Sequence, residues 1–87
     1  MVEIHLYEDD KKSIANHNQE PFRVMIAPAL DIDNKRRIFT VPSVDGKELI
    51  SFYFLEYSHD SNLFCFYKHP ELPFGNLLMS STHLWKF

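Results

Sequence analysis

Two neighbouring segments of the chain carry bulky apolar side chains at successive positions, and this pattern constrains the fold more than any other. They are residues 52–57, FYFLEY, and residues 63–67, LFCFY. Successive residues of a strand point to opposite faces of a sheet, so a sheet with one solvated face should alternate apolar and polar residues. These segments do not alternate. Both faces of the hairpin that they predict must therefore be covered, by the rest of the chain or by another molecule.

Length and composition predict a single compact domain, residues 1–87, that is stabilised by packing alone. A chain of 87 residues leaves too little material for a second core. Its one cysteine, Cys65, cannot form an internal disulfide. The chain contains eight Phe, four Tyr and one Trp, and each aromatic side chain can bury about 150–250 Å². We therefore expect an aromatic core to offset the conformational entropy that is lost on folding.

The charge of the chain argues against partners that are recognised through phosphate groups. The formal net charge is −3 at pH 7, and the one basic cluster is residues 35–37. Proteins that bind nucleic acid or anionic membranes neutralise many negative charges with Lys and Arg. We therefore expect neither nucleic acid nor a membrane as a partner.

The sequence predicts a cytoplasmic protein, either in its own cell or in an infected host. It has no run of 18 apolar residues, and residues 1–5 do not resemble the start of a secretory leader. Cys65 lies between two Phe residues, where a thiol serves as a small core side chain and stays reduced in the cytoplasm.

Alternating apolar residues predict the first strands. Residues 2–7 and 22–27 both alternate, and Pro28 ends the second of these segments because it cannot donate to a strand ladder. Residues 29–37 then form a polar connection to a third strand at residues 38–41.

The segment between the first two predicted strands has almost no apolar face. Residues 8–20 contain two apolar side chains, Ile14 and Ala15. We expect a polar loop there, with at most a minor helix that begins at Asp10 or Ser13.

Asp45 and Gly46 give the strongest local signal, because Asp-Gly supplies the two positive φ angles of a type I′ hairpin turn. This loop sets Val41 opposite Ile50 across the hairpin. The same register predicts four further pairs, namely Phe39 with Phe52, Thr40 with Ser51, Ile38 with Tyr53 and Pro42 with Leu49. Pro42 has no N–H to donate, so it must lie on an unpaired edge or beside a bulge.

A second hairpin turn is predicted at the polar residues 58–62, which completes a central meander over residues 38–68. It pairs Tyr57 with Leu63 and Phe54 with Phe66. Alternation then gives a Phe-rich face that we interpret as core, comprising Phe39, Val41, Ile50, Phe52, Phe54, Phe64 and Phe66. The opposite, Tyr-rich face comprises Ile38, Tyr53, Leu55, Tyr57, Leu63, Cys65 and Tyr67. Tyrosine is the aromatic residue that tolerates one solvated end.

The last part of the chain predicts one or two short final strands, at residues 77–79 and 82–87, with a docked terminus. The whole pattern predicts a mainly β fold, or α+β if the minor helix forms. We expect a small antiparallel sheet or barrel of about five to seven short strands.

No pattern in the sequence predicts catalysis, a cofactor or a metal. Only two glycines are present, and neither belongs to a phosphate-binding loop. The five histidines are not spaced as metal ligands, and the pair His59 and Asp60 is typical of a solvated turn. Cys65 has apolar neighbours and therefore lacks the electropositive setting of a nucleophile. We expect a protein that is not an enzyme.

The surplus of aromatic surface favours a non-enzymatic protein-binding module that docks through its Tyr-rich face or an edge strand beside it. Stand-alone domains of this size and acidity include toxin-neutralising immunity proteins and phage-encoded inhibitors of host machinery, and the hypothesis extends to that class by analogy. The predicted partner-binding residues are Tyr53, Leu55, Tyr57, Leu63 and Tyr67.

Three alternatives stay open. The same face can join two copies in a homodimer. A small barrel can bind a ligand or single-stranded nucleic acid by aromatic stacking, through Tyr53, Tyr67 and Trp85. A small hydrolase or metal enzyme would use His59, His69 or His83.

Overall fold

Nine β-strands and one short helix are formed by the residues that the computed structural model describes, which are all except 18, 73, 75, 80–83 and 87. The elements are β1 Val2–Tyr7, α1 Lys11–His17, β2 Arg23–Ala27, β3 Asp31–Asp33, β4 Ile38–Pro42, β5 Leu49–Tyr53, β6 Glu56–Asp60, β7 Leu63–Tyr67, β8 Asn76–Met79 and β9 Leu84–Lys86. The predicted mainly β class is therefore confirmed. Seven of these short strands lie between residues 2 and 67, and a last hairpin follows them.

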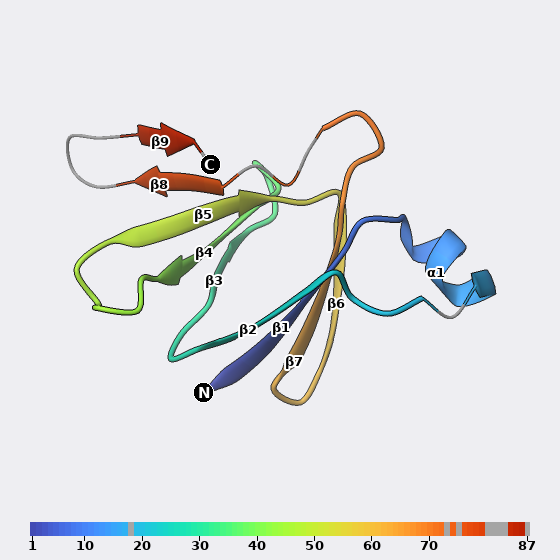
Figure 1. The fold of residues 1–87 in the computed structure, drawn as a ribbon, viewed down its shortest axis with the longest axis horizontal. Helices are drawn as coiled ribbons and strands as arrows, with labels where there is room; N and C mark the ends of the chain where they lie inside the picture. Colours follow the sequence, from blue (N-terminus) through green and yellow to red (C-terminus); the bar gives the residue numbers. More distant parts are fainter. Residues whose placement is uncertain (18, 73, 75, 80–83, 87) are drawn as a thin grey trace.

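The strands are arranged in two sheets (Figure 1). Sheet A has the order β2-β1-β7-β6, and sheet B has the order β3-β4-β5-β8-β9. These strands do not close into a barrel, so of the two predicted architectures the sheet is the one observed. One pair differs from the expected antiparallel pattern, because β1 and β7 are parallel. No turn joins these two strands directly, and the long path through sheet B returns the chain in the direction of β1.

A single cluster of aromatic and aliphatic side chains fills the space between the two sheets. Ile4, Leu6 and Phe66 come from sheet A, and Phe39 and Phe52 come from sheet B; none is more than 2% exposed. The ring of Phe39 stacks on Phe66 with centroids 3.9 Å apart and on Phe52 at 4.9 Å. The Phe-rich core that the sequence predicted is therefore present, and it binds the two sheets together.

The predicted register of the β4–β5 hairpin is confirmed at every pair, from Ile38 with Tyr53 to Pro42 with Leu49. Pro42 needs no bulge. The Ser43 N–H donates to the Glu48 carbonyl over 2.8 Å, so alternation turns the nitrogen of Pro42 away from β5. On that side β3 has already ended, because its last pair is Asp31 with Thr40.

The turn of this hairpin is not the predicted type I′ turn. Of its residues only Gly46 has a positive φ, 73°, and its N–H donates to the Ser43 carbonyl over 2.9 Å. Asp45 keeps a negative φ, because its carboxylate accepts hydrogen bonds from the Ser43 hydroxyl and the Lys47 N–H within the loop. The outcome is a longer loop with the same register.

The predicted register of the second hairpin is wrong by three residues. Tyr57 pairs with Phe66 and His59 pairs with Phe64, around a turn in which Ser61 has a φ of 55°. The cause lies before β6, where the chain passes from sheet B to sheet A. The Phe54 N–H still donates to the carbonyl of Arg37, in the turn that precedes β4 of sheet B, whereas the next N–H, that of Leu55, donates to the carbonyl of Tyr67 in sheet A. Because the shift is an odd number of residues, the β6 side chains that were predicted to point outward point inward, and the reverse.

Where the sequence favoured a polar loop with at most a minor helix, the structure has the seven-residue helix α1. Asp10 caps it, since its carboxylate accepts the Ser13 N–H over 2.8 Å and its carbonyl accepts the Ile14 N–H over 3.1 Å. This start was one of the two predicted. No helix in the part of the chain that the structure describes has the length and apolar character needed to cross a membrane.

Candidate functional site

The five predicted partner-binding residues do not share one face. Tyr53 lies on the outer face of sheet B and is 37% exposed, while Leu55 lies in the link between the sheets. Tyr57 points inward, with its ring 5.6 Å from Phe54 and 5.5 Å from Phe66. Its half-buried side chain packs against the core.

The remaining two predicted residues, Leu63 and Tyr67, lie at opposite ends of β7 on the outer face of sheet A. By alternation and register this face also carries Glu3, His5, Tyr7, Val24, Ile26, Glu56, Ser58, Asp60 and Cys65. Tyr67 is only 7% exposed, because its ring stacks on Tyr7 with centroids 5.3 Å apart. Of the predicted set, Tyr53 is exposed, Leu55, Tyr57 and Leu63 are half-buried, and Tyr67 is buried.

Cys65 lies on this outer face, paired with His5 of β1 and Ser58 of β6. The His5 ring nitrogen Nε2 is 2.6 Å from a carboxylate oxygen of Glu3, so an acid, an imidazole and a thiol share one surface. Burial is the main cause that raises the pKa of the Cys65 thiol; Glu3 raises it further and a hydrogen bond with Tyr7 opposes the shift. A thiol with a raised pKa is less ionised and is not an activated nucleophile.

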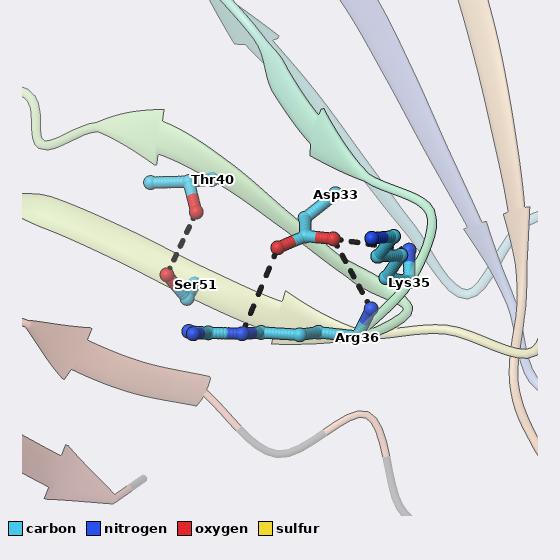
Figure 2. A network of polar contacts seen from close by, with 5 residues as sticks. All are labelled: Asp33, Lys35, Arg36, Thr40 and Ser51. Atoms are coloured by element: carbon cyan, nitrogen blue, oxygen red, sulfur yellow. Dashed lines mark hydrogen bonds and ion pairs between the residues drawn. The ribbon is translucent and has the colours of Figure 1, made fainter.

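The basic residues 35–37 lie in the turn between β3 and β4, where Figure 2 shows Lys35 and Arg36 beside Asp33. The Asp33 carboxylate accepts the Lys35 and Arg36 N–H groups over 3.0 and 3.1 Å, and Arg36 Nε lies 3.8 Å from the same carboxylate. Arg37 has a φ of 57° and its guanidinium donates to the Leu55 carbonyl. The cluster therefore stabilises a turn and a link, and Asp33 offsets part of its charge.

The histidines with described side chains have structural contacts. The His59 ring stacks on Phe64 with centroids 5.2 Å apart, and His69 Nδ1 accepts the Glu71 N–H over 3.0 Å. Within the described ranges no group of three or more His, Cys, Asp or Glu residues is placed to hold a metal ion. His83 and the side chain of Trp85, which two of the alternatives would use, lie outside the described part of the chain.

The strand β2 forms one edge of sheet A, and the hydrogen bonds of β1 show which of its backbone groups face outward. The Glu3 N–H donates to Asn62 over 2.9 Å, and the Tyr7 carbonyl accepts the Lys68 N–H over 3.0 Å. The odd residues of β1 thus bond to β7, so its even residues bond to β2, where Ile4 is paired with Met25. The N–H and C=O groups of Val24 and Ile26 consequently point to the free edge.

The side chains of the same two residues are also exposed, Val24 to 52% and Ile26 to 65%. Edge strands are usually protected by charges or by shortness. The opposite edge, β6, carries Glu56 and Asp60, and the sheet B edge β3 has three residues of which two are Asp. The strand β2 carries neither an acidic residue nor a charge on its outer face, so it is an unprotected edge.

An apolar groove of about 460 Å³ lies beside this edge, between β2 and the β4–β5 hairpin. Its walls include Arg23, Met25 and Ala27 from β2, and Val41, Ile50 and Phe52 from sheet B. The Arg23 guanidinium carbon lies 5.9 Å from the centre of the Phe52 ring. Outward backbone groups, exposed Val and Ile side chains and an adjoining groove together form the candidate site, which we call the β2 edge.

The sequence contained a signal for this site that the prediction did not use. Residues 22–27 alternate only in part, because Val24 and Ile26 are apolar on one face while Met25 and Ala27 are apolar on the other. The criterion applied to residues 52–57 and 63–67 therefore applies here as well. Pro21 and Pro28 bracket the segment and limit its length.

No protein family model, characterised protein or solved structure matched the chain in our comparisons. The β2 edge is therefore assigned from its own residues.

Proposed function

We propose that the chain is a non-enzymatic protein-binding module, and that its partner adds an extended segment to the β2 edge. The observation that supports this most directly is the coincidence of outward backbone groups and exposed apolar side chains at Val24 and Ile26. In strand addition the backbone hydrogen bonds supply affinity, and alternate side chains supply specificity. The β2 edge offers both.

Backbone pairing alone would give modest affinity, because each hydrogen bond contributes about 0.5–1.5 kcal/mol net. The groove beside β2 supplies the second contribution, since every other side chain of an added strand would point toward Met25 and Phe52. An apolar side chain buried there would act as the anchor of the interface.

The proposal includes a biological class. A small acidic domain that captures a strand of another protein suits an inhibitor or immunity-type protein, such as a phage-encoded antagonist of host machinery or a toxin-neutralising protein, acting in the cytoplasm. The net charge of −3 would favour a basic partner through electrostatic steering.

The ligand-binding or nucleic-acid-binding alternative has less support. Its proposed stacking residues Tyr53 and Tyr67 lie on different sheets, and Tyr67 is buried. Arg36, which would attract phosphate, is paired with Asp33.

The decisive experiment compares the native chain with Val24→Pro. Proline at this position removes an N–H that points to the free edge, so the β1–β2 ladder stays intact. Leu49→Lys is the matched control, because Leu49 is also 52% exposed but lies on sheet B. We expect Val24→Pro, and not the control, to lose a protein captured from lysate.

Capture alone does not show that the partner pairs with the β2 edge. Amide hydrogen exchange of the purified complex tests this pairing. The Val24 and Ile26 amides should become protected on binding, whereas the Met25 amide, which already faces β1, should change little. A bound partner that leaves the Val24 and Ile26 amides exchanging as in the free chain at a concentration where it is monomeric would contradict the proposal.

A further inference from the structure

We propose that two copies of this chain pair through their β2 strands and form a symmetric dimer that covers the β2 edge until a partner displaces it. The inference concerns the same edge as the proposed function and rests on that edge being a binding surface. It adds the occupant, a second copy, and a regulatory consequence, competition between self-pairing and partner binding.

The directions of the backbone groups define how the two strands would pair. A two-fold axis at Met25 sets Val24 of one copy opposite Ile26 of the other, and each of these residues has both its N–H and its C=O directed outward. In an antiparallel pair two such residues exchange both hydrogen bonds. Every outward donor then meets an outward acceptor.

The residues at the ends of β2 exclude the neighbouring symmetric registers. Moving the strands by two residues in one direction places Pro28 opposite Val24, and Pro28 has no N–H. Moving them in the other direction places Phe22 opposite Ile26, and the Phe22 N–H already donates to the Leu6 carbonyl over 2.9 Å. Only the register centred on Met25 satisfies all the outward groups.

The side chains are compatible with this register. On the outer face the exposed Val24 would lie beside the exposed Ile26 of the second copy, a cross-strand pair of β-branched residues. On the inner face the two Met25 side chains would meet above the groove that they already line.

Charge complementarity favours a second copy as the occupant. In the proposed register Arg23 lies across from Ala27 of the other copy, between its Ile26 and its Pro28. A hollow lined by Ile26 and Pro28 is also lined by Asp45 at the tip of the β4–β5 hairpin. Each Arg23 would therefore lie near the hairpin tip that carries Asp45 of the opposite copy, and the two-fold axis would repeat this pair of opposite charges.

Cysteine cross-linking tests the register. In a Cys65→Ser background, Met25→Cys places two thiols directly opposite each other in a pair without hydrogen bonds, where Cα atoms are about 4.5 Å apart and a disulfide fits. Val24→Cys is the matched control. In this register residue 24 lies opposite residue 26 of the second copy, so the two cysteines at position 24 are beyond disulfide reach. We expect oxidative dimers with Met25→Cys only. Dimers with Val24→Cys only would overturn the register, and with it the proposal.

Light scattering coupled to size exclusion tests the dimer without a cross-link. We expect the native chain to change from monomer to dimer mass as its concentration rises, Val24→Pro to weaken self-association by at least about tenfold, and Leu49→Lys to leave it unchanged. Circular dichroism checks that each variant is folded.

The outcomes separate the two proposals. A native chain that is monomeric at all concentrations, without Met25→Cys cross-links, overturns the dimer; a dimer that Val24→Pro does not weaken overturns it as well. Neither result affects the proposed function, which fails if Val24→Pro still captures the partner or if the bound partner leaves the Val24 and Ile26 amides as unprotected as in the free monomer. A partner that converts the native dimer to monomer and keeps these amides more protected than in the free monomer would support both.

Discussion

The two edges of sheet A are built differently. The edge at β6 carries the carboxylates of Glu56 and Asp60 on its outer face, and Lys11 of α1 lies 3.8 Å from Glu56. The edge at β2 carries Val24 and Ile26 on the same face, both more than half exposed. Charge on an edge strand prevents uncontrolled pairing with other chains. The contrast indicates that one edge is closed to pairing and that the other is available for it.

The largest effect on stability is expected from truncating a core side chain in the middle of sheet A, on which both edge strands depend. Phe66 is fully buried at the centre of sheet A and contacts Phe39 and Phe54. Phe66→Ala should lower the free energy of unfolding by about 3–5 kcal/mol, because it removes buried apolar surface and leaves a cavity in the core. Urea denaturation followed by circular dichroism measures this loss.

Leu72→Ala is the control for that substitution, because Leu72 is 53% exposed. It should change the free energy of unfolding by less than about 0.5 kcal/mol. A loss for Phe66→Ala as small as that for Leu72→Ala would mean that Phe66 does not lie in a core shared by the two sheets.

The next effect concerns the edge contrast itself. Ile26→Lys gives β2 the kind of charge that β6 already has, so it should abolish self-pairing and partner binding. At a concentration where the native chain is monomeric, its free energy of unfolding should change by no more than about 0.5 kcal/mol, since the side chain is 65% exposed. Light scattering and thermal melting measure the two quantities separately.

Asp60→Lys on the opposite edge is the matched control, because it exchanges one charge for another on β6. We expect it to leave self-association unchanged. If Asp60→Lys dissociates the dimer as Ile26→Lys does, the two edges are not functionally different and the contrast fails.

The two hairpins of the central meander show how far the sequence determines the fold. The β4–β5 register follows from Asp45 and Gly46, because a local turn signal lies between two continuous strands. The β6–β7 register depends instead on where the chain leaves sheet B, and the segment from Phe52 to Tyr57 contains no Pro or Gly to mark that point. The break at Phe54 and Leu55 is set by tertiary hydrogen bonds to Arg37 and Tyr67, which no local pattern encodes.

The candidate site was predictable in kind but not in place. Apolar residues on both faces of a strand correctly indicated a surface in need of cover, and the same criterion describes Val24 and Met25. Which strand forms an edge depends on the parallel pairing of β1 with β7, two segments far apart in the chain. That pairing leaves β2 with one neighbour and β7 with two.

A smaller effect is expected at the hairpin tip beside the β2 edge. Gly46 has a φ of 73°, and a Cβ added there would meet no atom within 4 Å. Gly46→Ala should therefore cost about 1 kcal/mol through backbone strain alone, which thermal melting can detect. A loss as large as that of Phe66→Ala would show that the tip packs against other residues.

The smallest effect is a pH dependence at the same tip. Hydrogen bonds from the Ser43 hydroxyl and the Lys47 N–H lower the pKa of the Asp45 carboxyl. A carboxyl with a lowered folded-state pKa stabilises the fold above its unfolded pKa, and that contribution is lost as pH falls through the folded value. Stability should thus be insensitive to Asp45 near neutral pH and fall only below about pH 4.

Ser43→Ala should move the Asp45 pKa, followed by NMR, back toward its ordinary value. In the proposed dimer, ionised Asp45 would lie near Arg23 of the opposite copy. The dimer should therefore dissociate at a higher pH in Ser43→Ala than in the native chain. The substitution should not affect the β6 edge.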